Sequence, residues 1–329
     1  MKKNNPLVKD SEYASQKSKL GNAGYHSPRI IAASGLTDIV EKLGVDLEQA
    51  SQINSWAVRK IEKTGEHPPS FSSADLFYNR VKNPDKLPTG SNELNEILGG
   101  GIEFGAITHI YGPSGVGKTQ FCYNLCLEVQ RSVNEKETGA KAIYIDTENK
   151  FTPNRIIEIT KTRGLKIKDI LQNIMIVKTI NSTQLENTLQ KIPGLIEKDS
   201  KIKLVIVDSM INHYRHEYDG LQKLSERQGR LGKNIGLLQR TCQLYGVAVV
   251  ITNQVSSNSS SYSADKHIPT GGNVLIQSSK HLIYFNNSGR NFLAKIINST
   301  SLPRGEARFA IGNSGIKDPM MANSNRQTF

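Results

Sequence analysis

The chain has 329 residues, with 42 Lys+Arg against 30 Asp+Glu, a formal net charge of +12 and three cysteines. This length is enough for two or three domains, each with a hydrophobic core. The small number of cysteines excludes a disulfide-stapled miniprotein and indicates a reducing, cytoplasmic setting. We find no apolar run near the ~18 residues that a membrane helix needs, and no signal peptide. The positive charge predicts a polyanionic partner, with nucleic acid before a membrane surface; a merely solvated basic surface is the alternative.

The first sixty or so residues predict a separate helical domain. Residues 35–43 have helical apolar spacing that stops at Gly44, and residues 46–63 place apolar side chains at intervals of three and four. Residues 64–70 then have the Pro and Gly content of a linker. The chain thus divides into a helical N-terminal domain, a linker and a main domain, at residues 1–63, 64–88 and 89–329.

The main domain begins with short apolar runs rich in β-branched residues, each followed by a segment of helix length. These runs are residues 106–110, 142–146, 174–177, 204–208 and 247–251. Strands buried on both faces have this composition, and their alternation with helices predicts an α/β fold with a mainly parallel sheet. Three later runs are separated only by turn residues and predict antiparallel strands added to that sheet, at residues 281–285, 292–297 and 307–311.

A phosphate-binding loop follows the first predicted strand and opens a helix. The eight residues that fit this P-loop template are Gly112, Pro113, Ser114, Gly115, Val116, Gly117, Lys118 and Thr119. In such a loop, backbone N–H groups surround the β-phosphate and the lysine binds β- and γ-phosphate oxygens, while the hydroxyl of Thr119 binds Mg²⁺. The sequence therefore predicts a site for ATP and Mg²⁺.

Two acidic residues at the ends of other predicted strands complete this site. Asp208 ends the run 204–208, from which it can reach Mg²⁺ through water. Glu148 follows the run 142–146 and can polarise a water for attack on the γ-phosphate. A helix cap or a solvated loop acid is the alternative for Glu148, but beside a P-loop the sequence favours hydrolysis.

The order of these and other motifs resembles the RecA-like recombinases, and specifically their archaeal RadA branch, which is similar to the eukaryotic strand-exchange protein. The resemblance runs in family order from about residue 70 to residue 318 and includes the P-loop with Gln120 after it. The other matching segments are residues 89–91, 98–102, 145–148, 204–209, 215–218, 226–228, 252–255, 271–272 and 302–307. It implies a RecA-like ATPase core preceded by a helix-hairpin-helix module.

By position, the resemblance implies roles for several residues of the site. Glu148 matches the family's catalytic glutamate and Lys118 its P-loop lysine. Gln254 matches the γ-phosphate sensor, which sits where a DNA-binding loop begins, so it can couple nucleotide state to loop order. Arg155 falls where the family stacks an arginine against adenine; a solvated arginine at a helix start is its alternative.

The resemblance also implies contacts with DNA and with a second copy of the chain. Phe71 and Ala74 match an oligomerisation motif that plugs into the neighbouring subunit, and a head-to-tail contact of this type gives a helical filament or a ring. Two loops are expected to bind DNA, through Arg215, Lys223, Arg227, Arg230, Tyr262 and Lys266. Phosphate contacts of this kind are independent of sequence and weakened by salt, and a solvated helix face is the alternative for the first loop.

The implied function is an ATP-dependent DNA recombinase that forms a filament on single-stranded DNA and promotes pairing and strand exchange in DNA repair. Single- and double-stranded DNA and recombination mediator proteins are its implied partners. The chain departs from the family at Leu221, in a second loop rich in serine at residues 256–269, and at residues 8–13, which replace the glycine hairpin of the N-terminal module. The alternatives are a divergent paralogue that assists a main recombinase, and a regulatory RecA-like ATPase with no DNA role.

Overall fold

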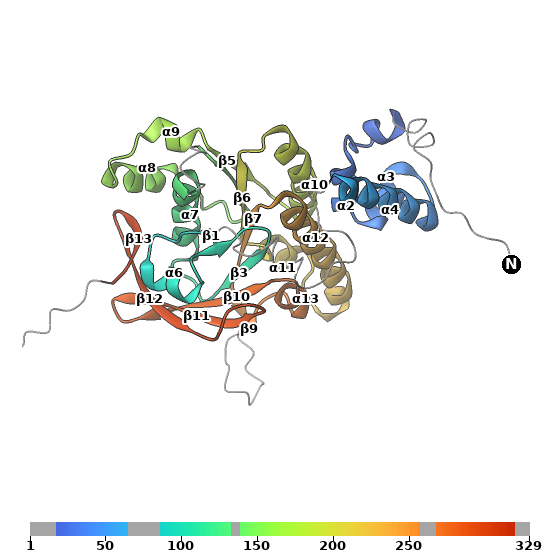
Figure 1. Cartoon of the computed structure of the whole chain (residues 1–329). Helices are drawn as coiled ribbons and strands as arrows, with labels where there is room; N and C mark the ends of the chain where they lie inside the picture. Colours follow the sequence, from blue (N-terminus) through green and yellow to red (C-terminus); the bar gives the residue numbers. More distant parts are fainter. Residues whose placement is uncertain (1–17, 65–85, 133–138, 257–267, 320–329) are drawn as a thin grey trace, which may run out of the picture.

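A nine-stranded sheet forms the centre of the molecule (Figure 1). The computed structural model describes residues 18–64, 86–132, 139–256 and 268–319. The strand order is β13-β12-β11-β10-β3-β7-β6-β4-β5; strands from β10 to β5 run parallel, and β10 to β13 pair antiparallel. The strands are β3 (Ile107–Tyr111), β4 (Lys141–Asp146), β5 (Ile174–Lys178), β6 (Ile202–Asp208), β7 (Ala248–Asn253), β10 (His281–Ser288), β11 (Asn291–Ser299), β12 (Glu306–Gly312) and β13 (Gly315–Lys317).

Apolar side chains fill both faces of this sheet. In β6, Leu204 and Ile206 join the core on one face, whereas Val205 and Val207 join the core on the other, as the period of two in a strand requires. Helices α7 (Lys118–Ser132), α8 (Pro153–Thr162) and α9 (Ile167–Leu171) cover the first face. Helices α10 (Ser182–Lys198), α11 (Asn212–Glu217), α12 (Leu224–Tyr245) and α13 (Asn273–Gln277) cover the second. The α/β fold with C-terminal antiparallel strands, predicted from the sequence, is confirmed.

Several short elements complete the main domain. Strands β1 (Lys86–Leu87) and β2 (Ile102–Glu103) pair with each other on either side of α6 (Asn92–Ile97). A turn of 3-10 helix, η1 (Leu221–Lys223), precedes α12. Strands β8 (Val255–Ser256) and β9 (Ile268–Pro269) form a small antiparallel pair that continues from the end of β7. The second predicted DNA loop therefore leaves the sheet right beside the carboxyl end of β7.

Three helices, α2 (Pro28–Ala33), α3 (Leu36–Leu43) and α4 (Leu47–Lys63), make a small N-terminal module with its own core (Figure 1). As predicted, α3 ends at Gly44, whose φ of 62° is left-handed, and Asp46 caps α4. The module packs on α10 and α12. Lys233 forms an ion pair with Asp38 at 2.7 Å, and Arg240 Nε donates to the carbonyl oxygen of Ala33 at 2.7 Å.

A buried carboxylate joins the β1–β2 pair to the start of β10. Glu103 accepts hydrogen bonds from Lys86 at 2.9 Å, from His281 at 3.2 Å and from Lys280. Burial alone would raise the pKa of Glu103, but the hydrogen bonds from His281, Lys280 and Lys86 outweigh it and hold the pKa well below its ordinary value. The ionised carboxylate therefore stabilises the fold at neutral pH.

We predict that Glu103→Gln lowers the free energy of unfolding at pH 7 by about 2 kcal/mol, because it removes the buried carboxylate that pairs with the half-buried Lys86 and Lys280. The pKa of Glu103 in the folded chain lies below its ordinary value of 4.5, so this stabilisation is present above that pH and is lost as the pH falls. Urea denaturation at pH 7 and pH 3 measures the difference, which should shrink at pH 3. The exposed Glu96→Gln is the control; equal stability of Glu103→Gln and wild type at pH 7 would contradict the prediction.

Candidate nucleotide-binding and catalytic site

The predicted P-loop lies between the end of β3 and the start of α7, packed tightly against the C-terminal strands. A Cβ atom on Gly112 would lie 2.2 Å from the carbonyl oxygen of Phe285 in β10. Gly117 has a φ of +88°, and a Cβ there would lie 2.5 Å from the side chain of Ile311 in β12. Glycine is therefore required at Gly112, because the backbone of β10 occupies the space of a side chain, and at Gly117, because its φ is left-handed.

Lys118 supplies a cation at the mouth of this loop. Its ammonium donates to the carbonyl oxygens of Gly112 and Pro113, each at 2.7 Å. Burial lowers the pKa of Lys118, and the carboxylates of Asp208 and Glu148 act in the opposite direction. Phosphate oxygens can replace the two carbonyl oxygens that hold this cation. A lysine of this kind beside a glycine-rich loop fits the phosphates of a nucleotide.

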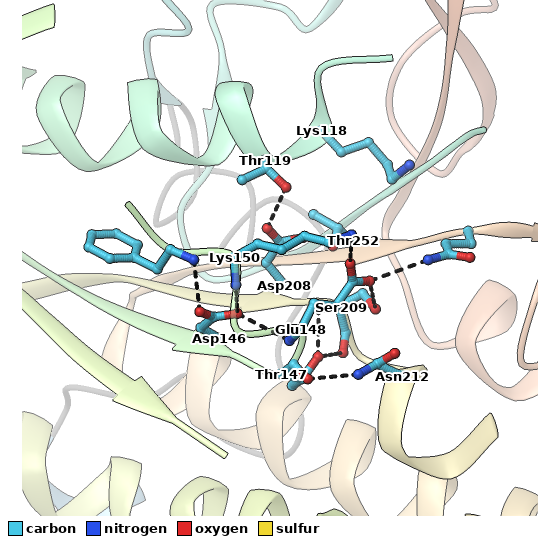
Figure 2. A network of polar contacts seen from close by, with 12 residues as sticks. Lys118, Thr119, Asp146, Thr147, Glu148, Lys150, Asp208, Ser209, Asn212 and Thr252 are labelled. Atoms are coloured by element: carbon cyan, nitrogen blue, oxygen red, sulfur yellow. Dashed lines mark hydrogen bonds and ion pairs between the residues drawn. The ribbon is translucent and has the colours of Figure 1, made fainter. Parts of the chain in front are cut away.

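Asp208 ends β6 and accepts hydrogen bonds from three hydroxyl groups. Its Oδ2 accepts from Thr119 at 2.7 Å, and its Oδ1 accepts from Thr252 (Figure 2). Oδ2 also accepts from the hydroxyl of Tyr144 at 2.6 Å. The structure thus brings together Thr119 and Asp208, the pair predicted for Mg²⁺. Hydroxyl and carboxylate oxygens are the donors that Mg²⁺ prefers, and they fit an ion that takes its other ligands from phosphate and water.

A tight turn after β4 presents Glu148. The carboxylate of Asp146, the last residue of β4, accepts backbone N–H groups of Glu148 at 3.1 Å, Lys150 at 3.2 Å and Phe151 at 2.9 Å. Asn149 has a φ of 55°, in the left-handed region that asparagine tolerates better than most residues. The side chains on either side of Asn149 consequently reach the same cavity.

Both carboxylate oxygens of Glu148 have partners (Figure 2). Oε1 accepts from the hydroxyl of Ser209 at 3.0 Å and from Nε2 of Gln254 at 3.4 Å, while Oε2 forms an ion pair with Lys150. Burial would raise the pKa of Glu148, but hydrogen bonds from Lys150, Ser209 and Gln254 lower it below its ordinary value. Glu148 is therefore ionised at neutral pH, as a group that accepts a proton from water must be.

These side chains line one cavity of about 590 Å³. Its lining includes the P-loop residues Ser114, Gly115, Gly117, Lys118 and Thr119, together with Glu148, Asp208 and Gln254. The other side chains that line the cavity are Gln120, Lys150, Arg290, Phe292 and Ile311. Of these, Gln120 entered the sequence prediction only as the residue after the P-loop, and the other four were not predicted. The sequence offers one signal for them, the cation Lys150 two residues after Glu148, since Arg290, Phe292 and Ile311 come from the β10–β11 hairpin and β12.

Arg155 lies beside this cavity, at the start of α8. Its guanidinium donates to Gln120 at 2.7 Å, to Glu158 at 2.7 Å and to the carbonyl oxygen of Gly312 at 2.6 Å. These contacts tie α8 to the end of β12, next to the cavity residue Ile311. Stacking of Arg155 on adenine stays a prediction.

Arg215, one of the predicted DNA-binding residues, contacts the nucleotide site through Gln254. It is exposed on α11, and its guanidinium donates to Oε1 of Gln254 at 3.4 Å. Gln254 therefore contacts Arg215 with its oxygen and Glu148 with its nitrogen. Gln254 also directly precedes β8, where the second predicted DNA loop begins.

The other basic residues of the first predicted loop differ in their surroundings. Lys223 is exposed. Arg227 donates to the carbonyl oxygen of Tyr218 at 3.3 Å, and Arg230 lies over the ring of Tyr218 at 5.2 Å and pairs with Glu186 at 3.3 Å. Lys223 also donates to a carbonyl oxygen, that of Glu217 at 3.4 Å. All three cations thus have contacts within the chain, but Arg227 and Arg230 are half-buried whereas Lys223 is exposed.

Some of the predictions concern parts of the chain that the structure does not describe. The predicted oligomerisation residues Phe71 and Ala74, the DNA-loop residues Tyr262 and Lys266, and residues 8–13 of the N-terminal module lie outside the described residues. Among the residues that are described, no helix combines the length and apolar character needed to cross a bilayer.

Comparison with known proteins agrees with this arrangement. A sequence model of the Rad51 family matches residues 82–319, which carry the P-loop, Glu148, Asp208 and Gln254. The DNA repair and recombination protein RadA of Cenarchaeum symbiosum is 36% identical over 303 residues, 92% of this chain and 76% of that protein. The protein of the same name from Metallosphaera sedula is 33% identical over 320 residues, 96% of this chain and 97% of that protein. These matches confirm the resemblance to RecA-like recombinases, and the chain belongs to the Rad51 family.

Proposed function

We propose that this chain is an ATP-dependent DNA recombinase that forms a filament on single-stranded DNA and promotes homologous pairing and strand exchange in DNA repair. The observation that carries the proposal is the position of Gln254, which contacts Glu148 in the nucleotide cavity and Arg215 on the exposed surface. A side chain that touches both places can make the order of the DNA loops depend on the nucleotide.

The chemistry of the cavity supports hydrolysis of ATP. Lys118 would bind β- and γ-phosphate oxygens, while Thr119 and Asp208 would hold Mg²⁺ and its water. The metal ion would neutralise charge that develops on the phosphate oxygens. Glu148, ionised and part of the same cavity, would orient the attacking water and accept its proton.

The exposed cations support a contact with DNA phosphates. Arg215 and Lys223 face solvent and can bind a backbone without reading its sequence. Tyr262 and Lys266 belong to the segment that joins β8 to β9, beside Gln254, and would add a stacking ring and a cation. Arg227 and Arg230 would have to exchange their contacts with Tyr218 for phosphates.

An open edge of the sheet supports assembly into a filament or ring. Strand β5 ends the nine-stranded sheet, and the exposed fractions of Met175 and Ile180 beside this edge are 42% and 82%. An edge strand offers unpaired backbone groups to another chain, and apolar side chains next to it add affinity. We expect Phe71 and Ala74 of a neighbouring copy to dock here, which gives a head-to-tail assembly.

A second candidate is a divergent paralogue that assists a main recombinase. It is favoured by the internal contacts of Arg227 and Arg230, which leave fewer free cations in the first loop. A strand-exchange assay with and without a second recombinase separates the two functions, because a main recombinase acts alone. A regulatory ATPase without a DNA role would hydrolyse ATP at the same rate with and without DNA.

For the wild-type protein, we predict that single-stranded DNA at low salt stimulates ATP hydrolysis. In Gln254→Ala, stimulation should fall to nearly none, because the connection between the cavity and the loops is removed. The ratio of rates with and without DNA measures this effect. Gln239→Ala, at an exposed position of α12 outside the cavity lining, is the matched control. Full stimulation of Gln254→Ala would contradict the coupling.

For Glu148→Gln, we predict a fall in kcat of about 100-fold or more, because the amide cannot accept a proton from water. Binding of ATP, followed by calorimetry, should persist because the P-loop is unchanged. Glu96→Gln, an exposed and remote change of the same type, should hydrolyse ATP like the wild type. If Glu148→Gln retained the wild-type kcat, another residue would have to activate the water.

For assembly, we predict that Phe71→Glu and Ile180→Glu are each monomeric when alone, because each places a charge in every proposed contact. Sedimentation velocity measures the assembly. An equimolar mixture of the two variants should form only dimers, since one intact Phe71 and one intact Ile180 can still meet. Phe71→Leu, which stays apolar, should assemble like the wild type; long oligomers of Phe71→Glu would refute the proposed contact.

A further inference from the structure

Lys150 gives the nucleotide cavity a cation that the P-loop does not supply. Its side chain lines the same cavity as Lys118, and its ammonium pairs with Oε2 of Glu148 (Figure 2). The two lysines are held in different ways. Lys118 is fixed by two carbonyl oxygens of its own loop, whereas Lys150 is held by the carboxylate that we propose to activate water.

The turn that carries Lys150 is well defined. Asp146 accepts three of its backbone N–H groups, and Asn149 adopts a left-handed conformation between Glu148 and Lys150. Lys178 of β5 donates to the side chain of Asn149 at 2.8 Å, which supports the turn from outside the cavity. The local fold therefore places Lys150 and Glu148 on one turn, with both side chains lining the same cavity.

This pairing restrains Glu148. Lys150 occupies Oε2, and Ser209 and Gln254 donate to Oε1, so every oxygen of the carboxylate already has a donor. A general base needs an oxygen that is directed at the water it deprotonates. Each oxygen can accept a further hydrogen bond, so these donors do not block the carboxylate but fix the direction of its remaining lone pairs.

The ion pair is suited to exchange. The side chain of Lys150 is 59% exposed, against 15% for Glu148, and an ion pair with one solvated partner contributes little to stability. A lysine ammonium on a flexible stem can turn toward another anion. A terminal phosphate in the same cavity would be a more highly charged partner than one carboxylate.

We propose that Lys150 is a positioning residue that restrains Glu148 in the nucleotide-free site and exchanges this carboxylate for an oxygen of the terminal phosphate of ATP. The exchange frees Glu148 only when the terminal phosphate is present, since ADP lacks the group that Lys150 binds. The proposal rests on the proposed function, in that ATP is the nucleotide of this cavity.

The test is to compare the affinities of Lys150→Met for ADP and for a non-hydrolysable ATP analogue, both with Mg²⁺, by calorimetry. Affinity for the ATP analogue should fall about tenfold, as expected for one lost hydrogen bond to a charged group, while affinity for ADP stays within about twofold of the wild type. Lys150→Arg, which keeps the charge, should retain most of the preference for the ATP analogue.

Lys178→Met is the matched control, because it removes a cation that supports the same turn without lining the cavity. It should leave the ratio of the two affinities unchanged. A wild-type ratio in Lys150→Met would overturn the inference alone, because the wild-type protein would still bind and hydrolyse ATP. If the wild-type protein bound neither nucleotide, the proposed function would fail first and the inference with it.

Discussion

The carboxylate of Asp208 is the interaction on which the rest of the site depends. It ends β6 and accepts hydroxyl groups from Thr119 on α7, Tyr144 on β4 and Thr252 on β7. Four elements are thereby joined at one edge of the sheet. A buried carboxylate is costly unless it is fully hydrogen-bonded, so loss of any of these hydroxyls would loosen the contact between the P-loop helix and the strands that carry the remaining groups.

The register of the parallel strands brings the other groups of the nucleotide site to the same end of the sheet. Asp146 of β4 lies opposite Asp208 of β6, and Tyr111 of β3 lies opposite Asn253 of β7. All four strands therefore end at the same level, where the P-loop leaves β3 and the turn with Glu148 leaves β4. Gln254 follows β7 directly. Their meeting in one cavity follows from the general rule that ligands bind at the carboxyl ends of parallel strands.

The sequence could predict those features that have a signature within a short stretch of residues. The buried strands, the P-loop and the acids at strand ends each have a signature within a few residues, and the structure places all of them together. The other cavity residues could not be found in this way. Arg290, Phe292 and Ile311 reach the P-loop only because β10 pairs with β3 and draws β11 and β12 after it, which is a long-range pairing that no local pattern encodes.

The sequence also does not show which of the positively charged residues are free to bind DNA. The net charge of +12 predicts a polyanionic partner, yet cations of α12 are used inside the chain. Arg230 pairs with Glu186, Lys233 pairs with Asp38 of the N-terminal module, and Arg240 binds the backbone of that module. Such contacts fix the module on α12, whose first turns carry Arg227 and Arg230 of the first predicted DNA loop. A cation that holds two parts of a chain together is not available to a phosphate without cost, so the affinity for DNA depends on exposed residues such as Arg215 and on the loop beside Gln254, rather than on the total charge.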